Sequence, residues 1–247
     1  MDSADPTGAE PAALATVILC GGRGTRAYPD SVQVPKPLLE VGQRPIVEHV
    51  MGTYTRHGCS RFVLATGYRH ELFDERYPPG PEAEVVPVDT GLDTDTGDRV
   101  ARAAALCEGP RFFATYGDGV GNVDLRALLR FHRTAGAEIT VTTVPLPSPY
   151  GTLETDPDGR VTEFREKPRL TDHWINAGFF VIERRALDHW VGANLEQDVL
   201  PAMAGRGVLF AYRHLGFWKS MDTFKDRQEL NLLAEEGTPP WERLDPA

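Results

Sequence analysis

Short apolar runs alternate with amphipathic segments along the first half of the chain. Runs of about four to eight apolar, often β-branched residues bounded by glycine or polar positions are typical of buried strands, whereas apolar residues three and four positions apart indicate helices. The expected strands are Thr16–Cys20, Arg61–Tyr68, Glu84–Gly91, Phe112–Gly119 and Glu138–Leu146. The expected helices are Pro45–Gly58, Asp98–Cys107 and Val123–Gly136.

This alternation predicts an α/β fold with a Rossmann-like, mainly parallel (mixed) sheet and helices on both faces. The second half differs, and we expect it to add a smaller β-rich elaboration on the substrate side. Its expected elements are a hairpin over Tyr150–Pro168 with the turn at Asp156–Gly159, a strand over Asn176–Glu183, a helix over Leu195–Gly207, a strand over 208–214 and an amphipathic helix over Thr223–Gly237. Residues 1–13 are polar and carry prolines, so they predict a flexible tail, followed by a single domain over 14–247.

Composition narrows the class of protein. The formal net charge of −10 disfavours a nucleic-acid binder, which needs a basic face, but allows a small anionic ligand. The three cysteines are widely spaced and form no CxxC pair, which argues against a zinc ribbon or disulfide scaffold and fits a reducing cytoplasm. The apolar run Leu14–Cys20 is too short to cross a bilayer, and the acidic N-terminus is unlike a signal peptide. We therefore expect a cytoplasmic protein without nucleic-acid or membrane partners.

A glycine-rich loop, CGGRGTR, follows the first expected strand. Glycines let successive backbone N–H groups face a phosphate, and Arg23 and Arg26 would add charge-assisted hydrogen bonds. A tight strand-to-helix turn is the structural alternative. The loop lacks the G-x-G-x-x-G spacing of a dinucleotide site, which disfavours a dehydrogenase, and it lacks the Walker Gly-Lys-Ser/Thr.

The next segments make the pattern specific. GGRGTR followed by PKPLLEVGQRPI resembles the signature of the sugar-phosphate nucleotidyltransferases, and YGDG, FREKP, INAGFF and GFWKSMD follow in an order similar to that of the cytidylyltransferases that use glucose 1-phosphate. The resemblance covers the chain from about Thr16 to its C-terminus. It implies condensation of a nucleoside triphosphate (CTP) with a sugar 1-phosphate (glucose 1-phosphate), giving CDP-glucose and pyrophosphate, with Mg²⁺ as cofactor. It also implies a homo-oligomer, although the segment between Tyr68 and Asp89 is shorter than in those enzymes.

The resemblance also implies roles for individual residues. The catalytic set is Arg26, Lys36 and Lys167, and the Mg²⁺ ligands are Asp118 and Asp222. The nucleotide-binding set is Cys20, Gly21, Gly22, Gly24, Thr25, Arg26, Lys36, Thr96, Gly97, Asp98, Gly117 and Asp118. The sugar-phosphate-binding set is Gly151, Glu166, Lys167, Asn176 and Gly178.

The implied reaction needs charge neutralisation more than proton transfer. A phosphate monoester has a second pKa near about 6, so it is largely a dianion at neutral pH and needs no general base. Basic side chains and a hard cation held by two carboxylates suit the meeting of two anionic reactants. Structural alternatives stay open: Asp118 could be a plain turn residue, Asp222 or Thr223 could cap the last helix, and Lys167 could be a solvated loop charge.

The choice of base and the catalytic role stay open in the sequence. A TGGR-like element of the family reads TGDR here, with Asp98 in place of the second glycine. An ionised Asp98 could accept a hydrogen bond from the amino group of cytosine, or it could cap the helix expected over Asp98–Cys107. The alternatives are therefore the same reaction with another base or sugar phosphate, and a non-catalytic regulatory protein that binds nucleotide sugars.

Overall fold

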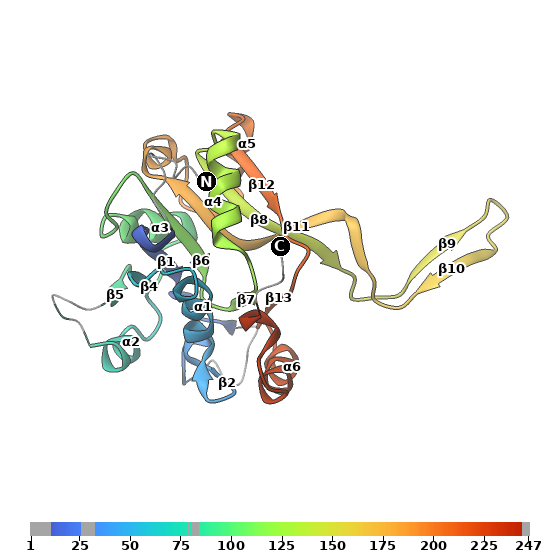
Figure 1. Cartoon of the computed structure of the whole chain (residues 1–247), viewed down its shortest axis with the longest axis horizontal. Coiled ribbons are helices and arrows are strands. Elements are labelled where there is room, and N and C mark those ends of the chain that lie inside the picture. The colour runs from blue at the N-terminus through green and yellow to red at the C-terminus, as the bar shows by residue number, and fades with distance from the viewer. Residues whose placement is uncertain (1–10, 26–32, 79, 81–83, 244–247) are drawn as a thin grey trace, which may run out of the picture.

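The computed structural model describes residues 11–25, 33–78, 80 and 84–243 (Figure 1). Its centre is a mixed seven-stranded sheet with the strand order β12-β8-β11-β6-β1-β4-β5. Neighbouring strands run parallel except that β11 is antiparallel to both β6 and β8. The sheet confirms the expected α/β class, and its strands are β1 (Thr16–Leu19), β4 (Phe62–Thr66), β5 (Val85–Asp89), β6 (Arg111–Tyr116), β8 (Ile139–Pro147), β11 (Arg169–Glu183) and β12 (Leu209–Arg213).

Both faces of the sheet are buried, which explains why its strands read as continuous apolar runs. In β1, Val17 and Ile18 are both fully buried but belong to different core clusters, because successive side chains of a strand point to opposite faces. The cluster around Ile18 takes in helices α1 (Ile46–Thr55) and α4 (Leu125–Ala135). The cluster around Val17 takes in α3 (Thr96–Ala104), the π-helical turn η6 (Leu195–Val199) and α5 (Leu200–Gly205).

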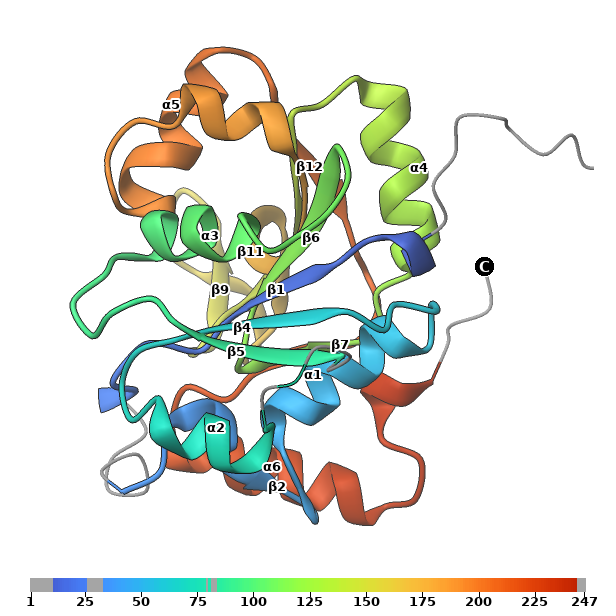
Figure 2. The same ribbon diagram turned by 90° about the vertical axis from the view of Figure 1, so that its left-hand side faces the viewer.

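Figure 2 shows α1 and α3 on opposite sides of the strands β1 and β4. The helix ends follow from local chemistry. The Asp124 side chain accepts hydrogen bonds from the backbone N–H groups of Arg126 and Ala127 and so starts α4, and Gly136 ends it at a φ of 63°. The remaining helical segments are α2 (Glu71–Arg76), α6 (Phe224–Glu235), η4 (Lys36–Leu38), η5 (Arg184–His189) and η7 (Pro240–Glu242).

Three two-stranded ribbons complete the fold: β2 (Glu40–Val41) with β3 (Arg44–Pro45), β7 (Gly119–Gly121) with β13 (Trp218–Ser220), and β9 (Thr152–Thr155) with β10 (Val161–Arg165). The β9–β10 ribbon is the expected hairpin, and it projects away from the rest of the molecule (Figure 1). Its turn is closed by a hydrogen bond from the N–H of Asp156 to the carbonyl of Arg160, and Gly159 adopts a φ of 83°.

Some boundaries differ from the sequence expectations. Helix α3 begins at Thr96, with Asp95 in the N-cap position, so the expectation that it begins at Asp98 was wrong. Strand β11 begins at Arg169, before the expected Asn176, because it also pairs with the far end of β8. The expected Leu195–Gly207 helix is divided into η6 and α5.

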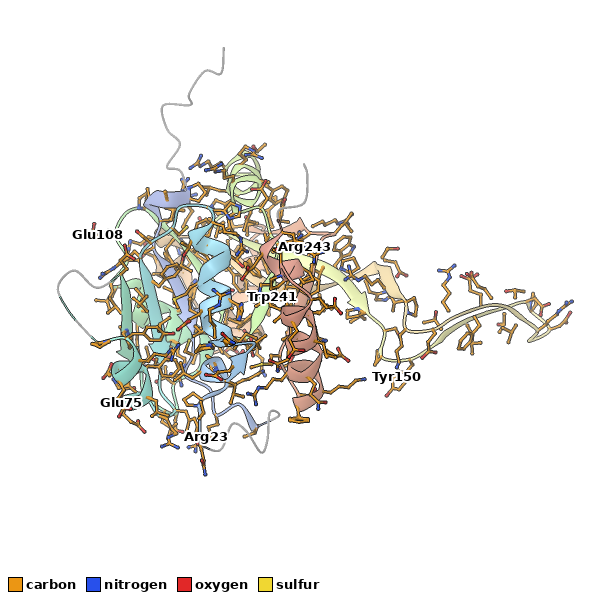
Figure 3. The ribbon with its side chains drawn as sticks, turned by 60° about the horizontal axis from the view of Figure 1, so that its bottom comes forward. Arg23, Glu75, Glu108, Tyr150, Trp241 and Arg243 are labelled. Atoms are coloured by element: carbon orange, nitrogen blue, oxygen red, sulfur yellow. The ribbon has the colours of Figure 1, made fainter. Side chains whose placement is uncertain are left out.

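The two ends of the described chain pack against the fold. Pro11–Ala13 form a 3₁₀ helix, η1, with Pro11 buried and its carbonyl accepting from the Cys59 thiol, so these three residues do not behave as the expected flexible tail; residues 1–10 lie outside the described part. Near the other end, Trp241 is fully buried. Its label lies near the middle of the molecule in Figure 3. No helix in the described ranges combines the length and apolar character needed to cross a bilayer.

Candidate active site

The glycine-rich loop leaves the carboxyl end of β1, beside the carboxyl ends of the parallel strands β4 and β6. Ligands of open α/β sheets bind beyond these strand ends. The loop is tied to β4 and the residues that follow it, because the N–H of Cys20 donates to Ala65 and the carbonyl of Gly21 accepts from Tyr68. A Cβ atom at Gly21 would collide with the Arg99 guanidinium, so a larger residue there would have to displace that buried side chain.

A cavity of about 510 Å³ opens at this edge of the sheet. Besides the glycine-rich loop, it is bounded by the Lys36–Pro37 segment, the loop 92–96, and the residues that end β6. The expected nucleotide-binding residues that line it are Cys20, Gly21, Gly22, Gly24, Thr25, Lys36, Thr96 and Asp118. Arg26, expected to be catalytic, lies outside the described residues.

Lys36 joins two distant carboxylates at the edge of this cavity. Its Nζ atom lies 2.6 Å from Oδ2 of Asp118 and 2.9 Å from Oδ1 of Asp222. The Lys36 side chain is 9% exposed, against 28% for Asp118 and 34% for Asp222. The structure therefore brings together three of the residues that the resemblance singled out, from positions far apart in the sequence.

The β7–β13 ribbon produces this meeting. Asp118 directly precedes the ribbon strand β7 and Asp222 follows β13, so antiparallel pairing of Gly119 with Ser220 puts the two aspartates side by side. The N–H of Met221 donates to the Asp118 carbonyl at 2.9 Å. Thr223, not Asp222, caps α6, through a capping box with Asp226. The Asp222 carboxylate is therefore not used as the helix cap.

Gly117 also has a steric reason to be glycine. A Cβ atom there would lie 3.0 Å from both the Leu19 carbonyl oxygen and the Cys20 sulfur, and 3.2 Å from Pro37. The N–H of Gly117 donates to that Leu19 carbonyl at 3.1 Å. This close approach seats the turn containing Asp118 against both the glycine-rich loop and the lysine segment.

The electrostatics of the cluster favour the charged form of Lys36. Burial alone would lower the pKa of Lys36, but the charges and hydrogen bonds of Asp118 and Asp222 outweigh it and raise that pKa. Lys36 is thus an ammonium ion near neutral pH. Across the described ranges, no three His, Cys, Asp or Glu side chains gather closely enough to form a metal cluster.

The sugar-side residues fall into two groups. Asn176 donates to the Tyr116 hydroxyl at 2.9 Å, and Gly178 has a φ of 75° and packs so closely that a Cβ atom there would lie 3.0 Å from the Tyr116 ring, so both residues lie beside a side chain that lines the cavity. In contrast, Gly151, Glu166 and Lys167 lie at the base of the projecting hairpin and do not line the cavity. Lys167 has a φ of 46°, and its ammonium lies 3.8 Å from Glu166.

The TGD segment contributes unevenly to the cavity. Thr96 lines it, while Gly97 packs on the backbone of Ala193, and Asp98 does not line it. Asp98 is the third residue of α3, so the alternative that it caps this helix was wrong. Asp95, one turn earlier, does line the cavity.

Sequence reasoning missed Arg99, which lines the cavity, and Glu196, which contacts two residues that line it. Arg99 is 4% exposed, and its guanidinium donates to the carbonyls of Thr66 and Leu92 and to the Thr90 hydroxyl, which ties together the ends of β4 and β5. Glu196 accepts from the hydroxyls of Tyr116 (2.5 Å) and Thr96 (2.7 Å). Arg99 completes the TGDR element and could have been found from it, whereas Glu196 carries no motif.

Comparisons with known proteins show what this chain is similar to. Residues 15–214 match the family model described as Nucleotidyl transferase. A glucose-1-phosphate cytidylyltransferase of Salmonella typhi is 34% identical over 92% of this chain and 98% of its own. The catalytic subunit beta of a Drosophila pseudoobscura pseudoobscura mannose-1-phosphate guanylyltransferase is 32% identical over 85% of this chain and 59% of its own.

The fold has close structural neighbours as well. A crystal structure of a putative glucose-1-phosphate thymidylyltransferase from Bacillus anthracis superposes with a TM-score of 0.70 at 21% identity, covering 91% of this chain and 96% of that one. At this identity the likeness concerns the fold: a mainly parallel sheet with an added β-rich region.

Proposed function

Because the chain belongs to the nucleotidyl transferase family and is therefore an enzyme, we propose that it transfers the cytidylyl group of CTP to glucose 1-phosphate, forming CDP-glucose and pyrophosphate. The observation that carries this proposal is the meeting of Lys36, Asp118 and Asp222 beside the glycine-rich loop. A non-catalytic, regulatory protein would have no need to keep this cluster intact. The named cytidylyltransferase relative, matched over nearly the full length of both chains, favours cytosine and glucose.

In the proposed reaction, a phosphate oxygen of the sugar phosphate attacks the α-phosphorus of CTP. A new P–O bond forms there, and the bond from the α-phosphorus to the bridging oxygen breaks, so that pyrophosphate leaves with that electron pair. Backbone N–H groups of the glycine-rich loop bind the triphosphate, and Lys36 and Arg26 neutralise its charge. Positioning and electrostatic stabilisation supply the acceleration, as in other phosphoryl transfers.

The carboxylates of Asp118 and Asp222 fit a Mg²⁺ site. Both face one point from which a single cation contacts them, and carboxylate oxygens are the protein ligands that Mg²⁺ prefers. Bound there, Mg²⁺ would neutralise charge on the phosphates and offer its open coordination positions to phosphate oxygens. Ser220 donates to Oδ2 of Asp222 at 2.8 Å and so orients that carboxylate.

For the second substrate, we propose that Glu166 and Asn176 hold the sugar and that Lys167 holds its phosphate, with Gly151 and Gly178 leaving room for it. The partners of the protein are then two small anionic molecules and a second copy of the chain in a homo-oligomer. The three described cysteines are buried and free, which supports a reducing compartment, the cytoplasm.

A screen for pyrophosphate release tests this function. Four nucleoside triphosphates are paired with a panel of sugar 1-phosphates in Mg²⁺, and we expect CTP with glucose 1-phosphate to give the highest kcat/KM. EDTA should abolish turnover, and Asp118→Asn should lower kcat/KM at least 10²-fold, or about 3 kcal/mol of transition-state stabilisation.

The matched control is Asp172→Asn, which removes an exposed carboxylate on β11 and should leave kcat/KM unchanged. If the enzyme turns over only a different combination of nucleoside triphosphate and sugar 1-phosphate, that combination replaces CTP and glucose 1-phosphate in the proposal. Full activity in EDTA would remove the metal from the proposed mechanism.

A further inference from the structure

The ammonium of Lys36 occupies the space between the two carboxylates proposed to hold Mg²⁺. Its contacts of 2.6 and 2.9 Å with Asp118 and Asp222 leave no room for a second cation that binds both. A Mg²⁺ ion needs oxygen ligands at about 2.0–2.1 Å, so it would have to take the same position. Lysine and metal are therefore mutually exclusive there.

The lysine is the part of this cluster that can move. The two carboxylates are fixed by the paired ribbon β7–β13, by the hydrogen bond from Met221 to Asp118 and by the Ser220 hydroxyl on Asp222. The backbone at Lys36 is stiffened by a proline on each side, but the ammonium sits at the end of four rotatable methylenes. It can leave the carboxylates without any change in the backbone.

A bound triphosphate would compete with the two carboxylates for the Lys36 ammonium. Lys36 and the glycine-rich loop line the same cavity, so phosphates bound by the loop would offer it anionic partners in place of Asp118 and Asp222. Without nucleotide, the carboxylate pair would carry two adjacent negative charges if the ammonium were absent.

We propose that Lys36 is a resident counter-ion that keeps divalent cations out of the Asp118–Asp222 pair until a nucleoside triphosphate draws its ammonium away. This inference rests on the metal site of the proposed function and adds to it an order of binding, in which the nucleotide prepares the site for the metal. The free enzyme binds divalent cations poorly, and nucleotide and metal bind with positive coupling, since each favours the state in which the lysine has left the pair.

Binding of Mn²⁺ to the full chain without nucleotide tests the proposal, with free Mn²⁺ followed by electron paramagnetic resonance. We expect Lys36→Met to bind Mn²⁺ at least about tenfold more tightly than the wild type. Lys36→Arg keeps a cation and should stay weak. Lys225→Met, which removes an exposed lysine of α6, should match the wild type. The added affinity of Lys36→Met should vanish when Asp118→Asn is combined with it.

Each other outcome has a distinct meaning. Equal Mn²⁺ affinity of wild type and Lys36→Met would overturn the counter-ion role while leaving the proposed function intact. Failure of every protein to bind Mn²⁺, with CTP as well as without it, would overturn both. If Lys36→Met melts too low to be measured, Lys36→Gln replaces it, and its melting temperature should rise with Mn²⁺ by more than that of the wild type.

Discussion

At the scale of single residues, the two lysines of the proposed site have different surroundings. Lys36 is buried between two carboxylates beside the glycine-rich loop, whereas Lys167 is more than half exposed at the base of the hairpin. The proposal assigns the triphosphate to the first and the sugar phosphate to the second. A substitution at each position should therefore impair a different substrate.

We expect Lys167→Ala to raise KM for the sugar 1-phosphate by roughly tenfold or more, because a charge-assisted contact to phosphate contributes about 1.5–3 kcal/mol. Its affinity for CTP alone, measured by calorimetry, should stay that of the wild type. Arg165→Ala removes a nearby hairpin cation, paired with Glu163, and is the matched control. An unchanged KM in Lys167→Ala would remove this lysine from the sugar-phosphate site.

The residues of the candidate site were predictable in unequal measure. Lys36 and Asp118 stand out because prolines or glycines flank each of them. Glu196 could not be predicted, since its role depends on η6 being placed beside Tyr116 by the packing of the second core cluster. The sequence expectation placed the start of α3 two residues too late, at Asp98 instead of Thr96, because Asp98 is a residue type that commonly caps helices and Asp95, which is of the same type, occupies the cap position.

At the scale of elements, the sequence predicted the central strands well because both faces of the sheet are buried. It did not predict the β7–β13 ribbon, whose strands of three residues are too short for a periodic pattern and pair across a wide sequence separation. That ribbon aligns Asp118 with Asp222. The most informative contact of the site therefore came from an element without a local sequence signal.

The C-terminal element η7 is held through His49 of α1. The Nε2 atom of His49 lies 2.9 Å from the Val41 carbonyl, and Nδ1 accepts from the Trp241 indole N–H at 3.2 Å. The guanidinium of Arg44 lies 3.3 Å from Nδ1, while Glu242 lies 3.8 Å away. If Nδ1 were protonated, its N–H group would face two other donors, the Trp241 indole and the Arg44 guanidinium. The neutral imidazole, whose Nδ1 is an acceptor, therefore fits this site.

This arrangement predicts a pH dependence of stability. Burial lowers the pKa of His49, and the positive charge of Arg44 lowers it further. The hydrogen bond to the Val41 carbonyl and the negative charges of Glu242 and Glu48 oppose this shift but do not cancel it. The unfolded state, with a pKa near about 6.5, then binds the proton first as pH falls. The contribution of the neutral His49 to the free energy of unfolding is therefore complete above the pKa of the unfolded state and decreases as pH falls below it. One pH unit below that pKa, the loss is at most about 1.4 kcal/mol.

Chemical denaturation at pH 7.5 and 5.5 measures this effect. We expect His49→Gln to lower the free energy of unfolding at pH 7.5 but to flatten its decline toward pH 5.5. His173→Gln, at an exposed position of β11, should keep the decline of the wild type. A decline of equal size in His49→Gln and the wild type would contradict a neutral, buried His49.

At the scale of the whole molecule, the hairpin β9–β10 projects away from the fold, so contacts within a single chain do not account for its stability (Figure 1). Within the described part of the chain its strands pair only with each other, and an isolated hairpin is at best marginally stable in water. Leu153 and Phe164 form a cross-strand pair on it and are 59% and 61% exposed. Exposed apolar side chains grouped on one element are typical of an interaction surface, which supports the proposed homo-oligomer.

Light scattering on the full chain tests this role of the hairpin. We expect the wild type to have a mass that is a multiple of 27.3 kDa, and the double variant Leu153→Ser/Phe164→Ser to shift toward a single chain at the same concentration, because association would lose the burial of two large apolar side chains. The melting of the central sheet should change little, since neither residue belongs to its core clusters. Leu232→Ser, at a 60% exposed position of α6, controls for the loss of an exposed apolar side chain and should keep the wild-type mass. A wild type that scatters as one chain would remove the homo-oligomer, and an assembly that survives the double substitution would have to be held by another surface.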